Sequence, residues 1–285
     1  MVLKQQQSIT NKAKIHEYME STFDYREQQI SVTLTSASQI FEEYPRYVDF
    51  ENGSLILHDF YRKFYPRLSA SSATILSCIL GFWQCHSAMS SVEKRRSDFS
   101  CFKCEKIIGR FQNALVGLAE RKKVEVTKST DESLGALVLC LKVMPSVSRI
   151  KKADFSSKLG RLFYFVQENA SISSIVETKD EIYHKQPFLI VSGTLEHPLS
   201  FFLVIEKTAI PVGSNCAHAF HVLFASFFIF RLEYPQYLDK FFLFFEQFVF
   251  QIGKNISACN QEFANCLDNV ASATIPQSLE QQQQS

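Results

Sequence analysis

Glycine and tryptophan are scarce in this 285-residue sequence, which holds 9 Gly and 1 Trp against 27 Phe. Phosphate-binding loops rely on glycine, because only a backbone without a Cβ atom adopts their turns and approaches the phosphate closely. None of the patterns GxGxxG, GxxxxGK[ST] or GxSxG occurs in the chain. Nucleotide-binding and hydrolase functions of these kinds therefore lose their usual sequence support, and we expect no catalytic activity.

Long apolar runs and targeting segments are also missing. The first residues, MVLKQQQSITNKAK, contain neither the apolar core of a secretory signal nor the Arg-rich character of a transit peptide. Charged residues interrupt the Phe-rich stretch 220–250 at Arg231, Glu233 and Glu246, so no run reaches the roughly 20 apolar residues of a membrane-spanning helix. We expect an intracellular protein, cytoplasmic or nuclear, with no signal peptide, no transmembrane segment and no membrane partner.

The ends of the chain are polar. Residues 1–13 form a polar tail, and residues 273–285 form a tail that closes in SLEQQQQS. Between them we predict a single globular domain over 14–272, with a possible helical subregion at 14–128 and a possible α+β subregion at 129–272.

Apolar residues recur at a helical period through the front half of the sequence. The second of the predicted helices should end before Pro45, because proline lacks the amide proton that a helix needs. The front half should thus be a helical, bundle-like structure, with helices over 14–30, 36–44, 54–64, 70–83 and 103–121.

The rear half changes character. Ser129 and Glu132 have capping-box spacing ahead of an apolar segment that ends before Pro145, which favours a buried helix over a strand. The segment DFSSKLGRLFYFVQ predicts another helix. PFLIVSG and SFFLVIEKTAIP then predict a β-hairpin, and two Phe-rich helices follow, the first capped by Ser214 or Asn215 and the second starting near Pro235. The fold class is therefore α+β, predominantly helical.

One octapeptide is nearly repeated. EYPRYVDF occupies 43–50 and EYPQYLDK occupies 233–240, while the flanking sequences differ. We interpret the two copies as the same local device, a corner made by proline after a helix, and not as a duplicated domain.

Four residues form a weak candidate zinc site, because thiolates and imidazole are ligands that zinc prefers. These residues are Cys85, His86, Cys101 and Cys104. Only one CxxC pair is present, so the alternative is buried or surface thiols without a metal, and we expect no cofactor. A second, weaker metal candidate is the set Cys216, His218 and His221 at a predicted helix start.

Basic residues gather in the middle of the chain. Residues 92–152 hold 14 Lys and Arg against 7 Asp and Glu, a net charge of +7, within a chain of net charge +1. Such a region could bind the phosphates of a nucleic acid or another polyanion. The alternative is an ordinary solvated face. The candidate polyanion-binding residues are Arg95, Arg96, Arg121, Lys122, Lys123, Lys151 and Lys152.

Two segments resemble a known family. The segment MESTFDYREQQI…FEEYPRYVDFENGSLILHDFYR resembles the helical block of a group of animal proteins, many of them named sterile alpha motif domain-containing protein 3-like. The segment from QPFLIVSG to EQFVFQI resembles their closing block, in which a strand ending in AIP precedes two aromatic helices with YP between them. The resemblance spans about residues 15–253, and we expect the sterile alpha motif domain itself to be absent from this chain. The resemblance implies no catalytic residues.

These observations lead to two hypotheses of different classes. The first is a protein-interaction or scaffold module without catalytic activity, whose partner is another protein or a second copy of the chain. The second is a nucleic-acid or polyanion binding protein that uses the basic region 92–152, possibly derived from a mobile element.

Overall fold

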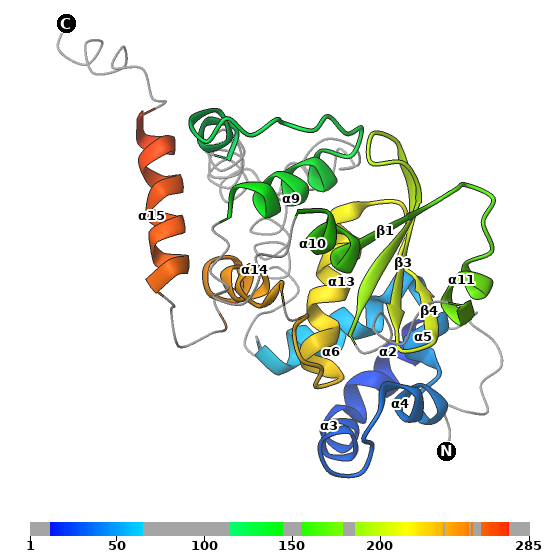
Figure 1. Cartoon of the computed structure of the whole chain (residues 1–285). Coiled ribbons are helices and arrows are strands. Elements are labelled where there is room, and N and C mark those ends of the chain that lie inside the picture. The colour runs from blue at the N-terminus through cyan, green and yellow to red at the C-terminus, as the bar shows by residue number, and fades with distance from the viewer. Residues whose placement is uncertain are drawn as a thin grey trace, which may run out of the picture. The chain divides into compact units, whose positions relative to one another are not determined.

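The structure is a computed structural model of the chain, shown in Figure 1. It divides into two compact units, each of which combines segments that are distant in the sequence. Unit 1 comprises residues 1–69, 129–131 and 156–239, and unit 2 comprises residues 70–128, 132–155 and 240–285. The prediction of one globular domain over 14–272 stays a prediction. The described residues are 12–64, 115–144, 155–178, 186–235, 237–250, 252 and 258–273.

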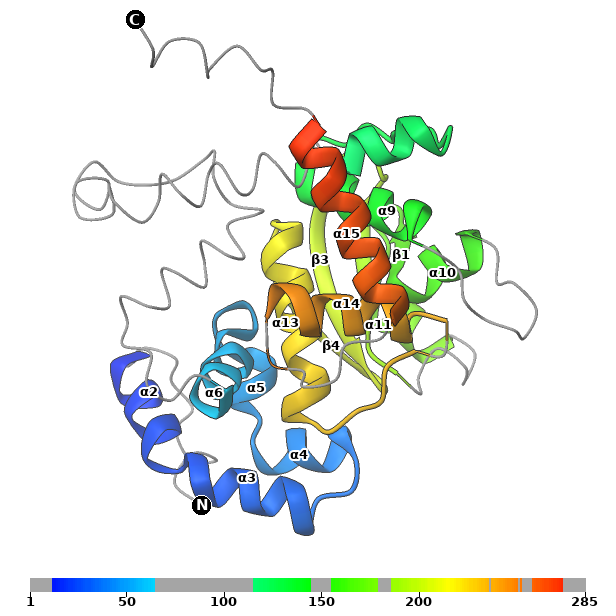
Figure 2. The ribbon, with the colours of Figure 1, turned by 90° about the vertical axis from the view of Figure 1, so that its left-hand side faces the viewer.

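The described part of unit 1 begins with five short helices, which Figure 2 shows grouped together in blue and cyan. The prediction of one helix over 14–30 was wrong in one respect, because a kink at Thr22 divides it into two helices. Backbone hydrogen bonds continue through the kink, but the Thr22 hydroxyl also donates to the Tyr18 carbonyl at 2.6 Å, a contact that often bends helices. The five helices are α2 (Lys12–Ser21), α3 (Phe23–Val32), α4 (Ala37–Glu43), α5 (Arg46–Asp49) and α6 (Ser54–Phe64).

The observed ends of α4 and α6 agree with the ends predicted from the sequence. Ser36 is the N-cap of α4 and accepts a hydrogen bond from the Gln39 amide, and α4 ends before Pro45 as predicted. A short 3-10 turn, η1 (Glu51–Gly53), leads into α6, which has the predicted bounds 54–64.

A four-stranded sheet lies at the centre of unit 1, in the order β1-β2-β3-β4. The predicted hairpin is confirmed: β2 (Phe188–Gly193) pairs antiparallel with β3 (Pro198–Ile205), and β4 (Thr208–Pro211) extends it. Gly193 has a φ of +106° and leaves only 2.4 Å between an added Cβ atom and the His197 carbonyl oxygen, so the turn requires glycine.

The first strand, β1 (Phe163–Val166), was not predicted. It pairs parallel with β2, in register Phe163 with Leu189. The predicted helix over DFSSKLGRLFYFVQ was therefore wrong in its second half, and α10 covers only Phe155–Leu162. Pairing with β2 overrides the helical period of these aromatic residues, as tertiary contacts often do.

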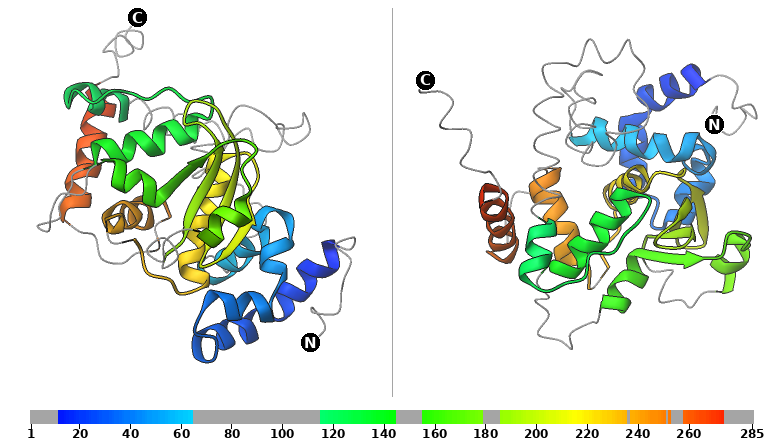
Figure 3. Two further views of the ribbon diagram at one scale, coloured as in Figure 1. Left: turned by 45° about the vertical axis from the view of Figure 1, so that its right-hand side comes forward. Right: turned by 90° about the horizontal axis from the view of Figure 1, so that it is seen from above.

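Helices cover both faces of the sheet. On one face, α11 (Ile172–Thr178) contributes Val176 to a buried cluster with Phe188, Ile190 and Val204. On the other face, α13 (Cys216–Ile229) packs against β2 and β3, and α6 packs against α13 (Figure 3). The Asn215 side chain caps α13 by accepting from the His218 amide at 2.9 Å, as predicted. Unit 1 is thus layered, with α6 lying beyond α13.

The repeated octapeptide forms the same turn twice. The Val48 amide donates to the Pro45 carbonyl at 3.0 Å, and the Leu238 amide donates to the Pro235 carbonyl at 2.8 Å. Tyr47 is fully buried in the first copy, whereas its counterpart Tyr237 is half-buried in the second copy and the next residue, Leu238, is buried. The predicted corner after a helix is therefore present in the first copy, where α4 ends at Glu43, but not in the second, because α13 ends at Ile229, six residues before Pro235.

The regular secondary structure described in unit 2 is helical, and residues 122–128 are irregular. Residues 115–121 are helical, and α9 (Glu132–Val143) is the predicted buried helix. The second Phe-rich segment forms α14 (Asp239–Phe244), followed by a π-helical turn, η2 (Phe245–Val249). The helix therefore starts at Asp239, four residues after the predicted start near Pro235. The final helix is α15 (Ala258–Ala273), from which the Phe263 ring lies edge-on to Phe244 at 5.2 Å.

The fold class is α+β and predominantly helical, as the sequence predicts. The predicted helix 70–83 and most of the predicted helix 103–121 lie outside the described residues. Within the described part of the chain, no helix combines the length and the apolar character that crossing a membrane requires.

Candidate functional site

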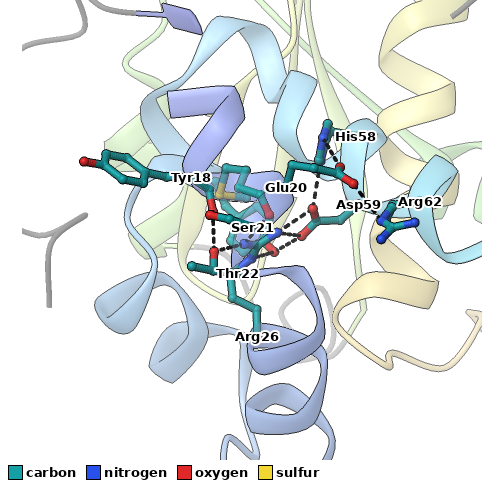
Figure 4. Close-up of polar contacts among 10 residues, drawn as sticks. Tyr18, Glu20, Ser21, Thr22, Arg26, His58, Asp59 and Arg62 are labelled. Atoms are coloured by element: carbon teal, nitrogen blue, oxygen red, sulfur yellow. Dashed lines mark hydrogen bonds and ion pairs between the residues drawn. The ribbon is translucent and has the colours of Figure 1, made fainter. Parts of the chain in front are cut away.

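A buried ion pair lies at the junction of the front helices of unit 1. Nη2 of Arg26 on α3 lies 2.6 Å from Oδ1 and 2.7 Å from Oδ2 of Asp59 on α6. The two side chains are 1% and 3% exposed. Figure 4 shows the guanidinium and the carboxylate pointing toward each other between the helices. The pair therefore joins α3 to α6 inside the protein.

Tyr47, on α5, completes this polar network. Its hydroxyl accepts from Nε of Arg26 at 3.2 Å and donates to Oδ2 of Asp59, and its side chain is fully buried. Nη1 of Arg26 donates to the Met19 carbonyl at 2.7 Å and to the Thr22 hydroxyl. The Arg26 side chain thus binds groups from α2, α5 and α6 together with the kink between α2 and α3.

The network favours the charged guanidinium of Arg26 and the neutral phenol of Tyr47. Burial acts to lower the pKa of Arg26, but Tyr47 and Asp59 outweigh it and the pKa is raised. Burial, then the charge of Asp59, raises the pKa of Tyr47 well above its ordinary value. Arg26 therefore stays charged and Tyr47 stays protonated, as expected of a structural network in which each proton has a partner.

A second, half-exposed layer surrounds the buried network. His58 Nε2 lies 3.2 Å from Oε2 of Glu20, and Arg62 Nε lies 2.9 Å from Oε1 of the same carboxylate. On its other side, His58 Nδ1 lies 3.0 Å from Oδ1 of Asp59. These contacts, visible in Figure 4, connect α2 to α6.

Asp59 also lines a small cavity in unit 1. The cavity has a volume of about 30 Å³, and its walls include the apolar side chains of Phe23, Ile30 and Ile229. A space of this size holds a water molecule and not a substrate. Since the cavity beside Asp59 leaves no room for a substrate, we interpret the network as a structural support for α3.

The outer face of α3 carries apolar side chains. Tyr25 is 60% exposed and Val32 is 76% exposed, while Phe23, Arg26 and Ile30 on the inner face are buried. Residues seven positions apart lie on the same face of a helix. The buried network therefore holds a helix that presents tyrosine and valine to solvent.

The predicted zinc ligands Cys85, His86, Cys101 and Cys104 lie outside the described residues, so the zinc site stays a prediction. In the described ranges, no group of three or more His, Cys, Asp or Glu side chains is arranged to hold a metal ion. The weaker candidates have other partners: His218 Nε2 lies 2.9 Å from the Asn52 carbonyl oxygen, and the buried His221 contacts the Tyr61 hydroxyl at 3.3 Å.

Three of the candidate polyanion-binding residues are described. Arg121, Lys122 and Lys123 are exposed at the end of the helical residues 115–121. The Lys122 ammonium donates to the Val143 carbonyl at the end of α9, at 2.7 Å. One of its three N–H groups is therefore used within unit 2. Arg95, Arg96, Lys151 and Lys152 lie outside the described residues.

Sequence reasoning did not single out the ion pair. The available signal was the position of Arg26, three residues after Phe23 and four before Ile30, on the apolar face of its helix. A charged residue on such a face is seldom buried without a partner. That signal indicates a buried cation but not which of the acidic residues binds it.

Comparison with known proteins gives one match. Residues 1–50 match the family model described as the helical domain of sterile alpha motif domain-containing protein 3. No curated protein matches the chain, and no solved structure matches it. The matched region contains α2, α3, α4 and α5, and therefore includes Arg26, Tyr47 and the exposed face of α3. The resemblance predicted from the sequence is confirmed over residues 1–50, which are similar to the helical domain of sterile alpha motif domain-containing protein 3.

Proposed function

We propose that the chain is a protein-interaction or scaffold module without catalytic activity, and that it acts inside the cell. The observation that carries this proposal is the exposed pair Tyr25 and Val32 on a helix whose opposite face is fixed by the buried Arg26 and Asp59 pair. Tyrosine is enriched among the residues that dominate binding energy at protein interfaces.

The rigid support adds to this argument. A helix that is already ordered loses little conformational entropy when it binds, so more of its contact energy contributes to affinity. Arg26 is bound to α2, α5 and α6, and α3 is therefore presented in one orientation. These features suit a binding surface better than they suit a reaction centre.

Affinity capture with quantitative mass spectrometry tests the proposal. Wild type, Tyr25→Ala, Val32→Ala and the control Leu199→Ala should be compared as purified bait proteins. Leu199 is a matched control, because it is 45% exposed and lies on β3. We expect one set of proteins to be lost with both α3 variants and retained with the control. Capture that does not differ among the four baits would contradict the proposal.

The second candidate function is nucleic-acid or polyanion binding through the basic region 92–152. The exposed Arg121 and Lys123 support it, since both can reach phosphates at the end of their helix. Fluorescence anisotropy of labelled DNA and RNA across a salt series tests this function. Binding that weakens steeply with salt and is reduced by Arg121→Glu and Lys123→Glu would support it, and no binding at low salt would exclude it.

A further inference from the structure

We propose that Lys158 and Arg161 on α10 form a phosphate-binding site, which takes the backbone of a single-stranded nucleic acid. This inference rests on the second candidate function and names a contact site for it outside the basic region 92–152.

The two cations have no anion inside the protein. Lys158 and Arg161 are half-buried residues of unit 1, and neither forms an ion pair or a hydrogen bond with another described residue. Five other basic side chains of unit 1 each lie next to a carboxylate. These pairs are Lys12 with Glu51, Arg26 with Asp59, Arg46 with Asp49, Arg62 with Glu20, and Lys63 with Glu27. The charges on α10 are therefore available to an anion from outside.

The two side chains are neighbours on one helix. They lie three positions apart, and side chains at this spacing adjoin each other on a helix surface. The sequence of α10, FSSKLGRL, contains no acidic residue. Burial lowers the pKa of Lys158, because its ammonium has lost contact with water and gained no anion. A phosphate oxygen beside the ammonium would favour its charged form.

The second copy of the octapeptide holds Arg161 in place. The guanidinium carbon of Arg161 lies over the Tyr237 ring, 5.2 Å from the ring centroid. In the first copy, the equivalent Tyr47 also contacts an arginine, since its hydroxyl accepts from Nε of Arg26 at 3.2 Å. Asp59 neutralises Arg26, whereas no described carboxylate neutralises Arg161. The second arginine is therefore positioned by a tyrosine but keeps its N–H donors for a ligand.

Two observations favour a nucleic acid over a single anion or an acidic peptide. Residues 149–161 contain five Lys and Arg and one Asp, a net charge of +4 that suits a polymer with repeated negative charges. The half-buried Tyr237 ring beside Arg161 suits an unpaired base, because bases of single strands stack on tyrosine. Arginine also matches the geometry of a phosphate group, to which it can donate two parallel hydrogen bonds.

Fluorescence anisotropy of the purified full chain with a labelled oligothymidine of about 20 nucleotides, longer than the site of one binding module, tests the proposal. The logarithm of the binding constant should fall linearly with the logarithm of salt concentration. Lys158→Gln and Arg161→Gln should each reduce that slope by about 0.7, and the double variant by about 1.4, because each removes one phosphate contact. Arg161→Lys keeps the charge and should keep the slope.

Matched variants separate this site from general charge effects. Lys12→Gln removes the same charge from a side chain that is paired with Glu51, so its slope should equal that of the wild type. Tyr237→Leu should raise the dissociation constant about tenfold through loss of stacking. An unchanged affinity of Tyr237→Leu would overturn the assignment to a single strand.

Lysine labelling tests the site in the unsubstituted protein. An N-hydroxysuccinimide ester acylates accessible lysine amines, and peptide mass spectrometry measures the extent at each position. Oligothymidine should protect Lys158 and leave Lys12 as reactive as before. This measurement does not depend on whether an α10 variant folds.

Three outcomes would overturn the proposal: a salt slope unchanged in the double variant, a Lys158 amine that oligothymidine does not protect, or poly-glutamate that competes as well as oligothymidine. The last would indicate an acidic protein partner. Binding that is lost with Arg121→Glu and Lys123→Glu but retained by the α10 variants would refute this site alone. No binding at low salt would refute the second candidate function as well.

Discussion

Nη2 of Arg26 lies within hydrogen-bond distance of both carboxylate oxygens of Asp59, at 2.6 Å and 2.7 Å, although the two residues are 33 positions apart in the sequence. A buried ion pair gains little over an apolar pair, because desolvating two charges offsets their attraction. Removing one partner is different, since it leaves an uncompensated buried charge. The pair therefore fixes how α3 meets α6 more than it raises the total stability.

Asp59→Asn should lower the free energy of unfolding by about 3–5 kcal/mol, because it leaves the Arg26 guanidinium buried without its counter-charge. Urea denaturation followed by circular dichroism measures the change. The double variant Arg26→Met/Asp59→Leu should be less destabilised than Asp59→Asn. A double variant that is destabilised as much as Asp59→Asn, or more, would contradict this interpretation of the ion pair.

His221 should make the chain sensitive to mild acid. Burial, with a smaller contribution from His218, lowers the pKa of His221 to about 3, whereas an unfolded histidine has a pKa near 6.5. As the pH falls below 6.5, the unfolded state binds a proton that the folded state does not bind, so stability is lost. The loss between pH 7 and pH 5 should be about 2 kcal/mol.

Urea denaturation at several pH values checks this expectation, with His221→Gln as the comparison. Glutamine does not titrate in this range and can still contact the Tyr61 hydroxyl. The variant should lose the part of the pH dependence that His221 contributes. Parallel pH profiles for wild type and variant would show that another group is responsible.

Gly53→Ala should destabilise unit 1. Gly53 has a φ of +79°, and a Cβ atom there would lie 2.8 Å from Cγ1 of Val222 on α13. The backbone strain costs about 1–2 kcal/mol, and the overpacking adds to it. Thermal denaturation should show a lower melting temperature. The double variant Gly53→Ala/Val222→Ala should lose less stability than the sum of the losses of the two single variants, because the smaller side chain at position 222 removes the clash. A loss equal to that sum would contradict the proposed clash.

Glu206→Ala should weaken the start of α4. The Glu206 carboxylate, in the turn between β3 and β4, accepts from the Ala37 and Ser38 amides at 3.0 Å and 2.9 Å. Loss of such a cap costs about 1 kcal/mol. Hydrogen exchange of the first amides of α4 should become faster. Glu206→Gln, which keeps one acceptor oxygen, should have a smaller effect, and equal exchange in all three proteins would refute the assignment.

Much of the local structure follows from the sequence. Ser36 and Pro45 define α4, and Asn215 caps α13, because caps and proline act on neighbouring residues. The hairpin of β2 and β3 follows from its two apolar runs and the turn between them. These features depend on short-range chemistry that a single sequence displays.

The features that were predicted wrongly or missed depend on contacts between residues far apart in the sequence. Phe163 and Val166 fit a helical period, yet both lie in β1 because β2 offers a strand to pair with. Arg26 and Asp59 come from separate helices, and neither residue identifies the other in the sequence. The exposed face of α3 was likewise missed, since which side of a helix faces inward depends on what packs against it.

The sequence match and the folding unit have different limits. The match ends at residue 50, but Asp59 neutralises Arg26 inside the matched region, and Glu206 caps α4 from 169 positions away in the sequence. A fragment cut at the family boundary would contain the Arg26 cation without its anion, and an α4 helix that keeps its Ser36 N-cap but lacks the Glu206 carboxylate. Fragments intended for biochemical work should therefore extend through the β3 and β4 turn, because the unit that is recognised by similarity is smaller than the unit that can fold.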